Sequence, residues 1–269
     1  MGTAFFYSLG GGMLVVLCTA RLEPISWKFI RLVGFLVFAL GCLAIGWRLR
    51  AAEAASGSAL WAWRFGVVFG VTAMLIAFLA PLSQRMGVWL RTLCMIGGTA
   101  GVLASCLSTP AMTSSNELPL SAAAVAMLSI GQILGALLLG SITVAWLLGH
   151  AYLTATKMTI APLRHFSRVL LGAIALRIAF MFLALGLPLL WGVGTDTVTT
   201  TTLGRSWLLL VLRVGVGLVA VGGFAYMVAD CVRLRATQSA TGILYFGSVF
   251  AYVGELAALQ LAADFAWPV

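Results

Sequence analysis

Long runs of apolar residues, separated by short polar connections, dominate the pattern of this chain. A helix needs ~20 mostly apolar residues to cross the hydrocarbon core of a membrane, whereas strands of a membrane barrel alternate in character over ~10 residues. The continuous runs therefore predict an all-α, polytopic integral membrane protein with about eight transmembrane helices. The runs lie at about 4–20, 29–47, 59–80, 87–106, 120–149, 166–190, 207–232 and 242–263.

The composition supports the same class of protein. Hydrophobic residues make up 62% of the chain and charged residues only 9%, whereas soluble domains have roughly 45–50% apolar and roughly 25% charged residues. No connection is long enough to hold a soluble domain. We therefore predict a single transmembrane domain over residues 1–269, with four spans within about 4–106 and four within about 120–263.

Lysine and arginine are distributed unevenly between the two sets of connections. Basic residues gather in the cytoplasmic loops of membrane proteins. Ten lie in or beside the odd-numbered connections and three lie on the opposite side. With eight spans, this predicts that both chain ends are on the non-cytoplasmic side. The ten are Arg21, Lys28, Arg31, Arg85, Arg91, Lys157, Arg164, Arg168, Arg233 and Arg235, and the three are Arg48, Arg50 and Arg205.

Charged residues also occur inside the predicted spans. Each ionisable side chain in the hydrocarbon costs roughly 2.5–3.5 kcal/mol on insertion scales, so it needs a partner or a cavity. Arg177 and Glu255 fall at nearly the same depth, near the middle of their spans, and we predict that they form an ion pair. Gln132 adds hydrogen-bonding capacity near that level, whereas Arg213 is expected to reach the outer head groups. The pattern leaves open whether the pair is functional or only structural.

The two histidines, His150 and His165, flank a basic loop at the predicted cytoplasmic surface. An interfacial histidine can pass protons to a quinol or along a transport path, with the hydroxyl of Tyr152 and the carboxylate of Asp230 expected nearby. Hydrogen bonds to head groups or backbone are the alternative. Haem b is not favoured, because both histidines stand at helix ends rather than inside the bundle. The ligand set is also too small to predict a metal site.

Three functions remain open, because the chain has none of the usual hydrolase, kinase or dinucleotide-binding motifs. The first is a non-catalytic or quinone-associated subunit of a larger, respiratory or other electron-transfer complex. The second is a proton- or ion-coupled transporter with a midplane Arg177–Glu255 pair, and the third is a scaffold or assembly protein. We assign no catalytic residue. The expected location is a bacterial inner membrane, with lipids and other subunits as partners and no nucleic acid.

Overall fold

The chain folds into a bundle of long helices, with no strand among the residues that the structure describes. The structure is a computed structural model that describes residues 1–22, 25–50, 57–83, 85–109, 122–154, 160–191 and 206–265. The helices are α1 (Gly2–Thr19), α2 (Trp27–Arg50), α3 (Gly57–Leu79), η1 (Ala80–Leu82), α4 (Gly87–Ser108), α6 (Ala122–Thr154), α7 (Ala161–Trp191), α9 (Trp207–Val211), η2 (Leu212–Ala220), α10 (Val221–Arg233) and α11 (Thr237–Phe265).

Within the described residues, eight helical segments are long and apolar enough to span a membrane. The successive helices α9, η2 and α10 form one of them, in which η2 has the wider π-helical geometry. This confirms the all-α fold with eight spans. Lys157 and Arg205 lie outside the described residues, and the side of the membrane on which the chain ends lie stays a prediction.

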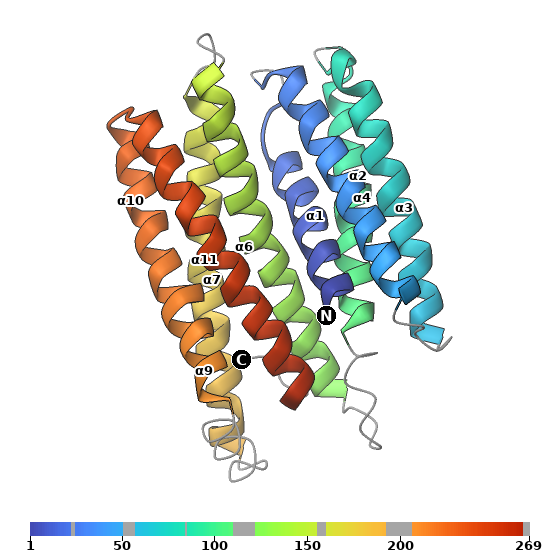
Figure 1. Ribbon diagram of the computed structural model, residues 1–269, viewed down its shortest axis with the longest axis vertical. Coiled ribbons are helices and arrows are strands. Elements are labelled where there is room, and N and C mark those ends of the chain that lie inside the picture. The colour runs from blue at the N-terminus through green and yellow to red at the C-terminus, as the bar shows by residue number, and fades with distance from the viewer. Residues whose placement is uncertain are drawn as a thin grey trace.

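The helices form two groups that meet along α1 and α6 (Figure 1). One group contains α1 to α4, and the other contains α6, α7, the α9–η2–α10 helix and α11. Helix α1 packs against α2 and α4 within its own group and against α6 across the boundary. Helix α6 has the matching place in the second group, since it packs against α7 and α11.

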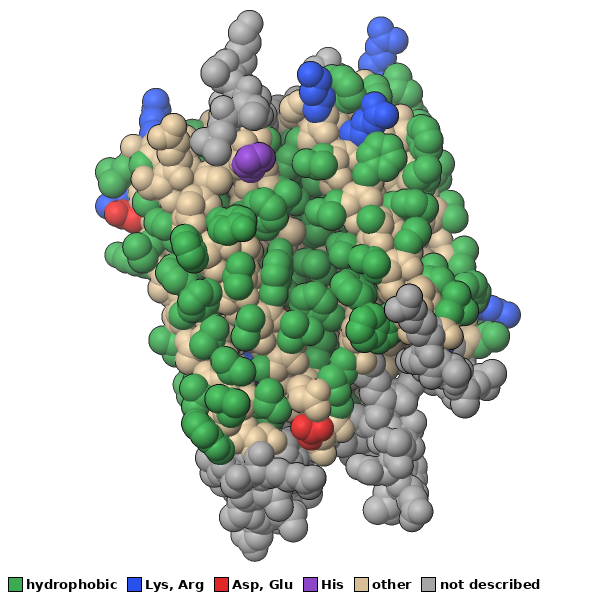
Figure 2. Space-filling view, viewed as in Figure 1, with side chains coloured by type: hydrophobic (Ala, Val, Ile, Leu, Met, Phe, Trp, Pro, Cys, Tyr) green, Lys and Arg blue, Asp and Glu red, His purple; other side chains and the backbone are tan. Residues whose placement is uncertain are grey.

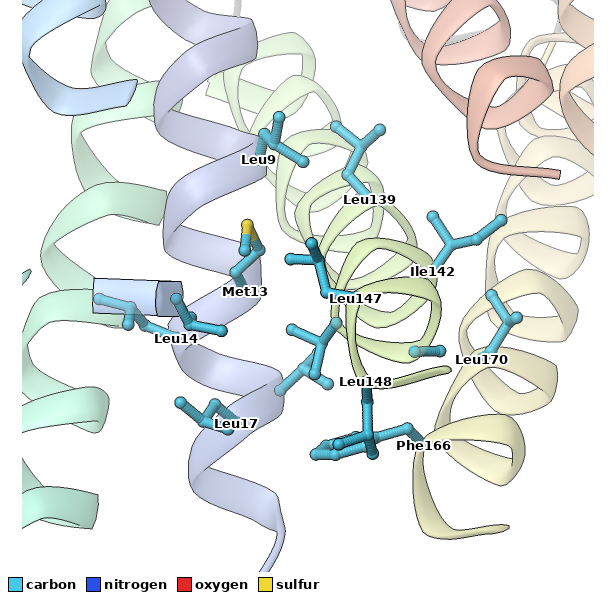
Figure 3. Close-up of a cluster of buried hydrophobic side chains, with 14 of the residues drawn as sticks. Leu9, Met13, Leu14, Leu17, Leu139, Ile142, Leu147, Leu148, Phe166 and Leu170 are labelled. Carbon is cyan, nitrogen blue, oxygen red and sulfur yellow. The ribbon is translucent and has the colours of Figure 1, made fainter. Parts of the chain in front are cut away.

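Close packing between α1 and α6 joins the two groups. Large buried side chains of both helices face each other there (Figure 3), including Leu9 and Met13 of α1 and Leu139 of α6. At Gly12, a side-chain Cβ would overlap the carbonyl group of Ala136. The absence of a side chain therefore lets the two backbones approach, as small residues commonly do in membrane helices.

Glycines recur at four-residue spacing in several spans, as Gly66 and Gly70 or Gly97 and Gly101 do, but not all of them make close contacts. A Cβ on Gly101 would lie only 2.9 Å from the Cα of Gly11, so this position is a close contact between α4 and α1. A Cβ on Gly70 would meet nothing within 4 Å. Close helix packing is therefore found at Gly101 but not at Gly70.

Apolar side chains cover most of the visible flank, and the Lys and Arg side chains gather mainly at one end (Figure 2). Many large hydrophobic residues are exposed, such as Phe78 at 64% and Trp89 at 69%. A surface of this kind fits contact with lipid, where aliphatic and aromatic side chains have no reason to be buried. The fold and surface together fit a multi-pass integral membrane protein.

Candidate functional site

The predicted pair of Arg177 and Glu255 is confirmed as a bidentate ion pair between α7 and α11. The Nε of Arg177 donates to Oε1 of Glu255 at 3.1 Å, and its Nη2 donates to Oε2 at 2.8 Å. The two residues are only 5% and 4% exposed. Two parallel charge-assisted hydrogen bonds of this kind fix the relative orientation of the side chains as well as neutralising charge.

A second arginine binds the same carboxylate, which corrects the expectation that Arg213 reaches the outer head groups. Arg213 is 1% exposed, and its Nη1 donates to Oε1 of Glu255 at 2.7 Å. It lies in η2, where Gly217 makes a close backbone contact with Gly254 of α11. We call Arg177, Arg213 and Glu255 the ion cluster. Its members come from three different spans, so the cluster ties together the second group of helices.

Two glycines of α6 make room for the ion cluster. The backbone carbonyl of Gly131 accepts a hydrogen bond of 2.7 Å from Nη1 of Arg177. At Gly135, a Cβ would lie 2.6 Å from Oε2 of Glu255, a distance that real side chains do not tolerate. Neither glycine was among the residues predicted for the site. The four-residue spacing of Gly131 and Gly135 is typical of close helix packing, but it does not indicate which side chains pack against them.

Gln132 connects the ion cluster region to the first group of helices. Its Oε1 lies 3.2 Å from the Oγ atoms of both Ser8 and Ser105, which can donate to it. The two hydroxyl oxygens are 2.6 Å apart, and Ser105 also lies 3.0 Å from the carbonyl oxygen of Ala4. The polar residues of the two groups are therefore not separate, because serines of α1 and α4 contact an amide of α6.

A small, partly open crevice adjoins Arg177, Glu255 and Gln132. Its cavity volume is about 10 Å³, which is close to the minimum that holds one bound water molecule. We call it the α6–α11 crevice. Its lining residues are Leu128, Gly131, Gln132, Arg177, Glu255, Ala258, Leu259 and Ala262.

The remaining candidate residues lie apart from the ion cluster. His150 and Tyr152 stand near the end of α6, and His150 is eighteen residues from Gln132, or about 27 Å along the helix. His165 lies near the start of α7, where its Nε2 is 2.9 Å from Oγ1 of Thr19. Asp230 pairs with the exposed Arg233 at 2.7 Å. None of these four residues lines the α6–α11 crevice.

The chemistry available at the site is hydrogen bonding and charge stabilisation in surroundings with little water. Arg177 supplies donors, Glu255 supplies an acceptor already held by two guanidinium groups, and Gln132 supplies an amide. Among the described residues, no three His, Cys, Asp or Glu side chains lie close enough to form a metal site. Comparisons with protein-family models, with curated proteins and with solved structures give no match for this chain.

Proposed function

We propose that the protein is a quinone-associated membrane subunit of a larger electron-transfer complex, located in a bacterial inner membrane. The observation that carries the proposal is the α6–α11 crevice, which places Arg177 and Gln132 beside apolar walls within a lipid-exposed bundle. Ligand sites of this kind combine mostly apolar surroundings with a few polar groups that orient the ligand. A quinone has matching chemistry, with a lipid-soluble tail and two carbonyl oxygens that accept hydrogen bonds.

The size of the crevice defines how the head group binds in this proposal. Space for about one water molecule admits a carbonyl oxygen but not a ring. The ring therefore lies at the mouth of the crevice, against Leu128 and Leu259, while its oxygen accepts hydrogen bonds from Arg177 or Gln132. When bound, the quinone supplies the electron-carrying chemistry. The proposal assigns the electron donor to a partner subunit, which would contact this chain at a surface still to be mapped.

Quinone binding can be tested with two matched glutamine variants. The protein is purified in mild detergent, its lipid extract is analysed for quinones, and the affinity for a short-chain quinone is measured by quenching of tryptophan fluorescence. Loss of one hydrogen bond in Gln132→Leu is expected to weaken binding about tenfold, since ~1.4 kcal/mol corresponds to tenfold in affinity. Gln260→Leu is the control, because Gln260 bonds to Asp264 and does not line the crevice. Absence of quinone from the extract, with equal affinities of the variants, would contradict the proposal.

A second candidate is a proton- or ion-coupled transporter, which is supported by the π-helical segment η2. Such segments are rare and are frequent at functional sites, and interrupted helices beside charged groups are common in transporters. Here η2 carries Arg213 directly to Glu255. The segment is therefore a departure from regular α-helical geometry at the ion cluster, which supports a transport mechanism.

Reconstitution into vesicles tests the transport function. A transporter predicts ion or proton flux by the chain alone, and Glu255→Gln should abolish that flux. Asp264→Asn is the matched control, because Asp264 is an exposed acid of the same helix. If both quinone binding and flux are absent while neighbouring subunits are recovered, the result supports a scaffold or assembly protein instead.

A further inference from the structure

The α6–α11 crevice extends from the ion cluster in one direction only. On α11 its other lining residues are Ala258, Leu259 and Ala262, all of which follow Glu255 towards the end of the helix at Phe265. On α6 the lining reaches back to Leu128, close to the start of that helix at Ala122. The start of α6 and the end of α11 lie at the same end of the bundle (Figure 1). The crevice therefore points to that end.

On the other side of Glu255, the contact between α6 and α11 is closed. The carboxylate lies directly against Gly135. One turn further along, the Tyr252 hydroxyl is 2.8 Å from Oγ1 of Thr143 and accepts a hydrogen bond of 3.5 Å from Nε1 of Trp146. Ala251 in the same turn of α11 has no exposed surface. Polar contacts and a fully buried alanine therefore fill this stretch of the contact between α6 and α11.

Arg177 lines the crevice and has more N–H donors than the three hydrogen bonds it makes to Glu255 and Gly131. A guanidinium group has five N–H donors. Within the described residues, three of them point to the two oxygens of Glu255 and to the carbonyl of Gly131. A buried donor without an acceptor is unfavourable. A ligand with one oxygen acceptor would satisfy a further N–H of Arg177, and the crevice has the volume for one.

We propose that the α6–α11 crevice is a one-sided entry route, through which a single water molecule reaches Arg177 from the non-cytoplasmic side. The side follows from the distribution of Lys and Arg, which assigns the end formed by the start of α6 and the end of α11 to that face. The route does not depend on quinone binding, because a chain that binds no quinone can still admit water. In the quinone-bound protein, the carbonyl oxygen would replace this water.

The route can be tested by the reaction of introduced cysteines with Ag⁺, an ion of about the size of a water molecule. The variants Ala258→Cys and Ala262→Cys place a thiol in the crevice. Ala251→Cys is the matched control, because it lies on the same helix but on the closed side of Glu255. Ag⁺ replaces the thiol proton, which passes to water, and so protects the sulfur from later labelling by a maleimide in the unfolded protein.

The native cysteines do not interfere with this measurement. Trypsin cleaves after Arg235, and the peptide 236–269 contains no Lys, Arg or native Cys. Its only thiol is the introduced one, so mass spectrometry of this peptide gives the fraction that Ag⁺ protected. Right-side-out and inverted membrane vesicles compare the two faces. Gel filtration of each variant in detergent checks that it is folded before its reactivity is interpreted.

The expected result is protection of Ala258→Cys and Ala262→Cys from the non-cytoplasmic side. These thiols should react at least about tenfold faster than that of Ala251→Cys, which is reached only through local opening. Three results would overturn the proposal: an unreactive Ala258→Cys in a folded protein, equal rates at Ala251 and Ala258, or reaction of Ala258→Cys from the cytoplasmic side. None of these results depends on whether quinone is found in the lipid extract.

Discussion

The two groups of helices are held together by different interactions. Helices α1 to α4 pack through glycines, aliphatic side chains and aromatic rings, with Tyr7 against Phe69 as an example. Helices α6, α7, η2 and α11 enclose an ion cluster with one carboxylate and two guanidinium groups. In lipid, apolar side chains gain little by contacting one another rather than acyl tails, so close shape fit stabilises the first group. The second group also packs closely, as at Gly217 and Gly254, but it is stabilised in addition by polar contacts, which lipid cannot replace.

This contrast indicates that the two groups of helices have different roles. Close packing without charge tolerates few changes of volume, and among the described residues its interior buries Tyr7 and Cys94 but no charged side chain. A buried ion cluster is expensive to form and depends on each of its members. The second group thus has the features of a site, while the first supports it through Ser8, Ser105 and the contact between α1 and α6.

Removal of the shared carboxylate should have the largest effect of any change considered. Glu255→Leu leaves the guanidinium groups of Arg177 and Arg213 close together without the anion that both contact. Breaking a buried ion pair in this way typically costs about 3–5 kcal/mol. Thermal unfolding in detergent should therefore show a large drop in midpoint for Glu255→Leu. The control Asp264→Leu, at an exposed acid of the same helix, should change it little, and similar midpoints would contradict the role of Glu255.

Removal of one arginine should have a smaller effect. In Arg177→Leu, Glu255 keeps its ion pair with Arg213, so one carboxylate still faces one guanidinium group. The variant loses the hydrogen bonds of Arg177 to Glu255 and Gly131 but leaves no buried charge without a partner, so the loss should stay below the ~3–5 kcal/mol expected for Glu255→Leu. A simple two-residue pair predicts equal effects for Arg177→Leu and Glu255→Leu. Unfolding midpoints of the two variants, measured side by side, distinguish a cluster of three from a pair.

The stability of the uncharged contact between α1 and α6 should depend on the volume of the side chains at the contact. Gly12→Ala adds a Cβ that would overlap the carbonyl of Ala136, so α1 and α6 must move apart, at a cost of about 1–3 kcal/mol. Gly70→Ala is the matched control, because its Cβ meets nothing within 4 Å. The midpoint of thermal unfolding should be well below that of Gly70→Ala for the Gly12→Ala variant. If the two variants are equally stable, the α1–α6 contact is not the close one described here.

Much of the architecture could be predicted from the sequence, because each span is a long apolar run that depends on local composition. The pairing of Arg177 with Glu255 also followed from their similar depths. Depth alone does not give the rotation of a helix about its axis. For that reason Arg213, with a long side chain near a helix end, was expected among the head groups although it points to Glu255.

The contacts of the small polar residues Ser8 and Ser105 could not be predicted from the sequence. Serine is common in membrane helices, where its hydroxyl can bond to its own backbone, as that of Ser108 does to Ala104. Ser8 and Ser105 therefore gave no signal that set them apart. Their role depends on contacts between residues separated by 97 and 124 positions. Such contacts follow from the packing of α1, α4 and α6 rather than from any local pattern.

The smallest predicted effect concerns the polar link between the two groups. Ser105→Ala removes a hydroxyl that contacts Ser8 and Gln132, whereas Ser108→Ala removes one that, among the described residues, bonds to Ala104 of the same helix. Interhelical hydrogen bonds in membranes contribute about 0.6 kcal/mol on average, so Ser105→Ala should lower stability by about that amount. Combining each variant with Gln132→Leu gives the coupling energy directly. Coupling is expected for Ser105 and not for Ser108. If the effects of Ser105→Ala and Gln132→Leu are additive, the first group packs against the site but does not orient the amide of Gln132.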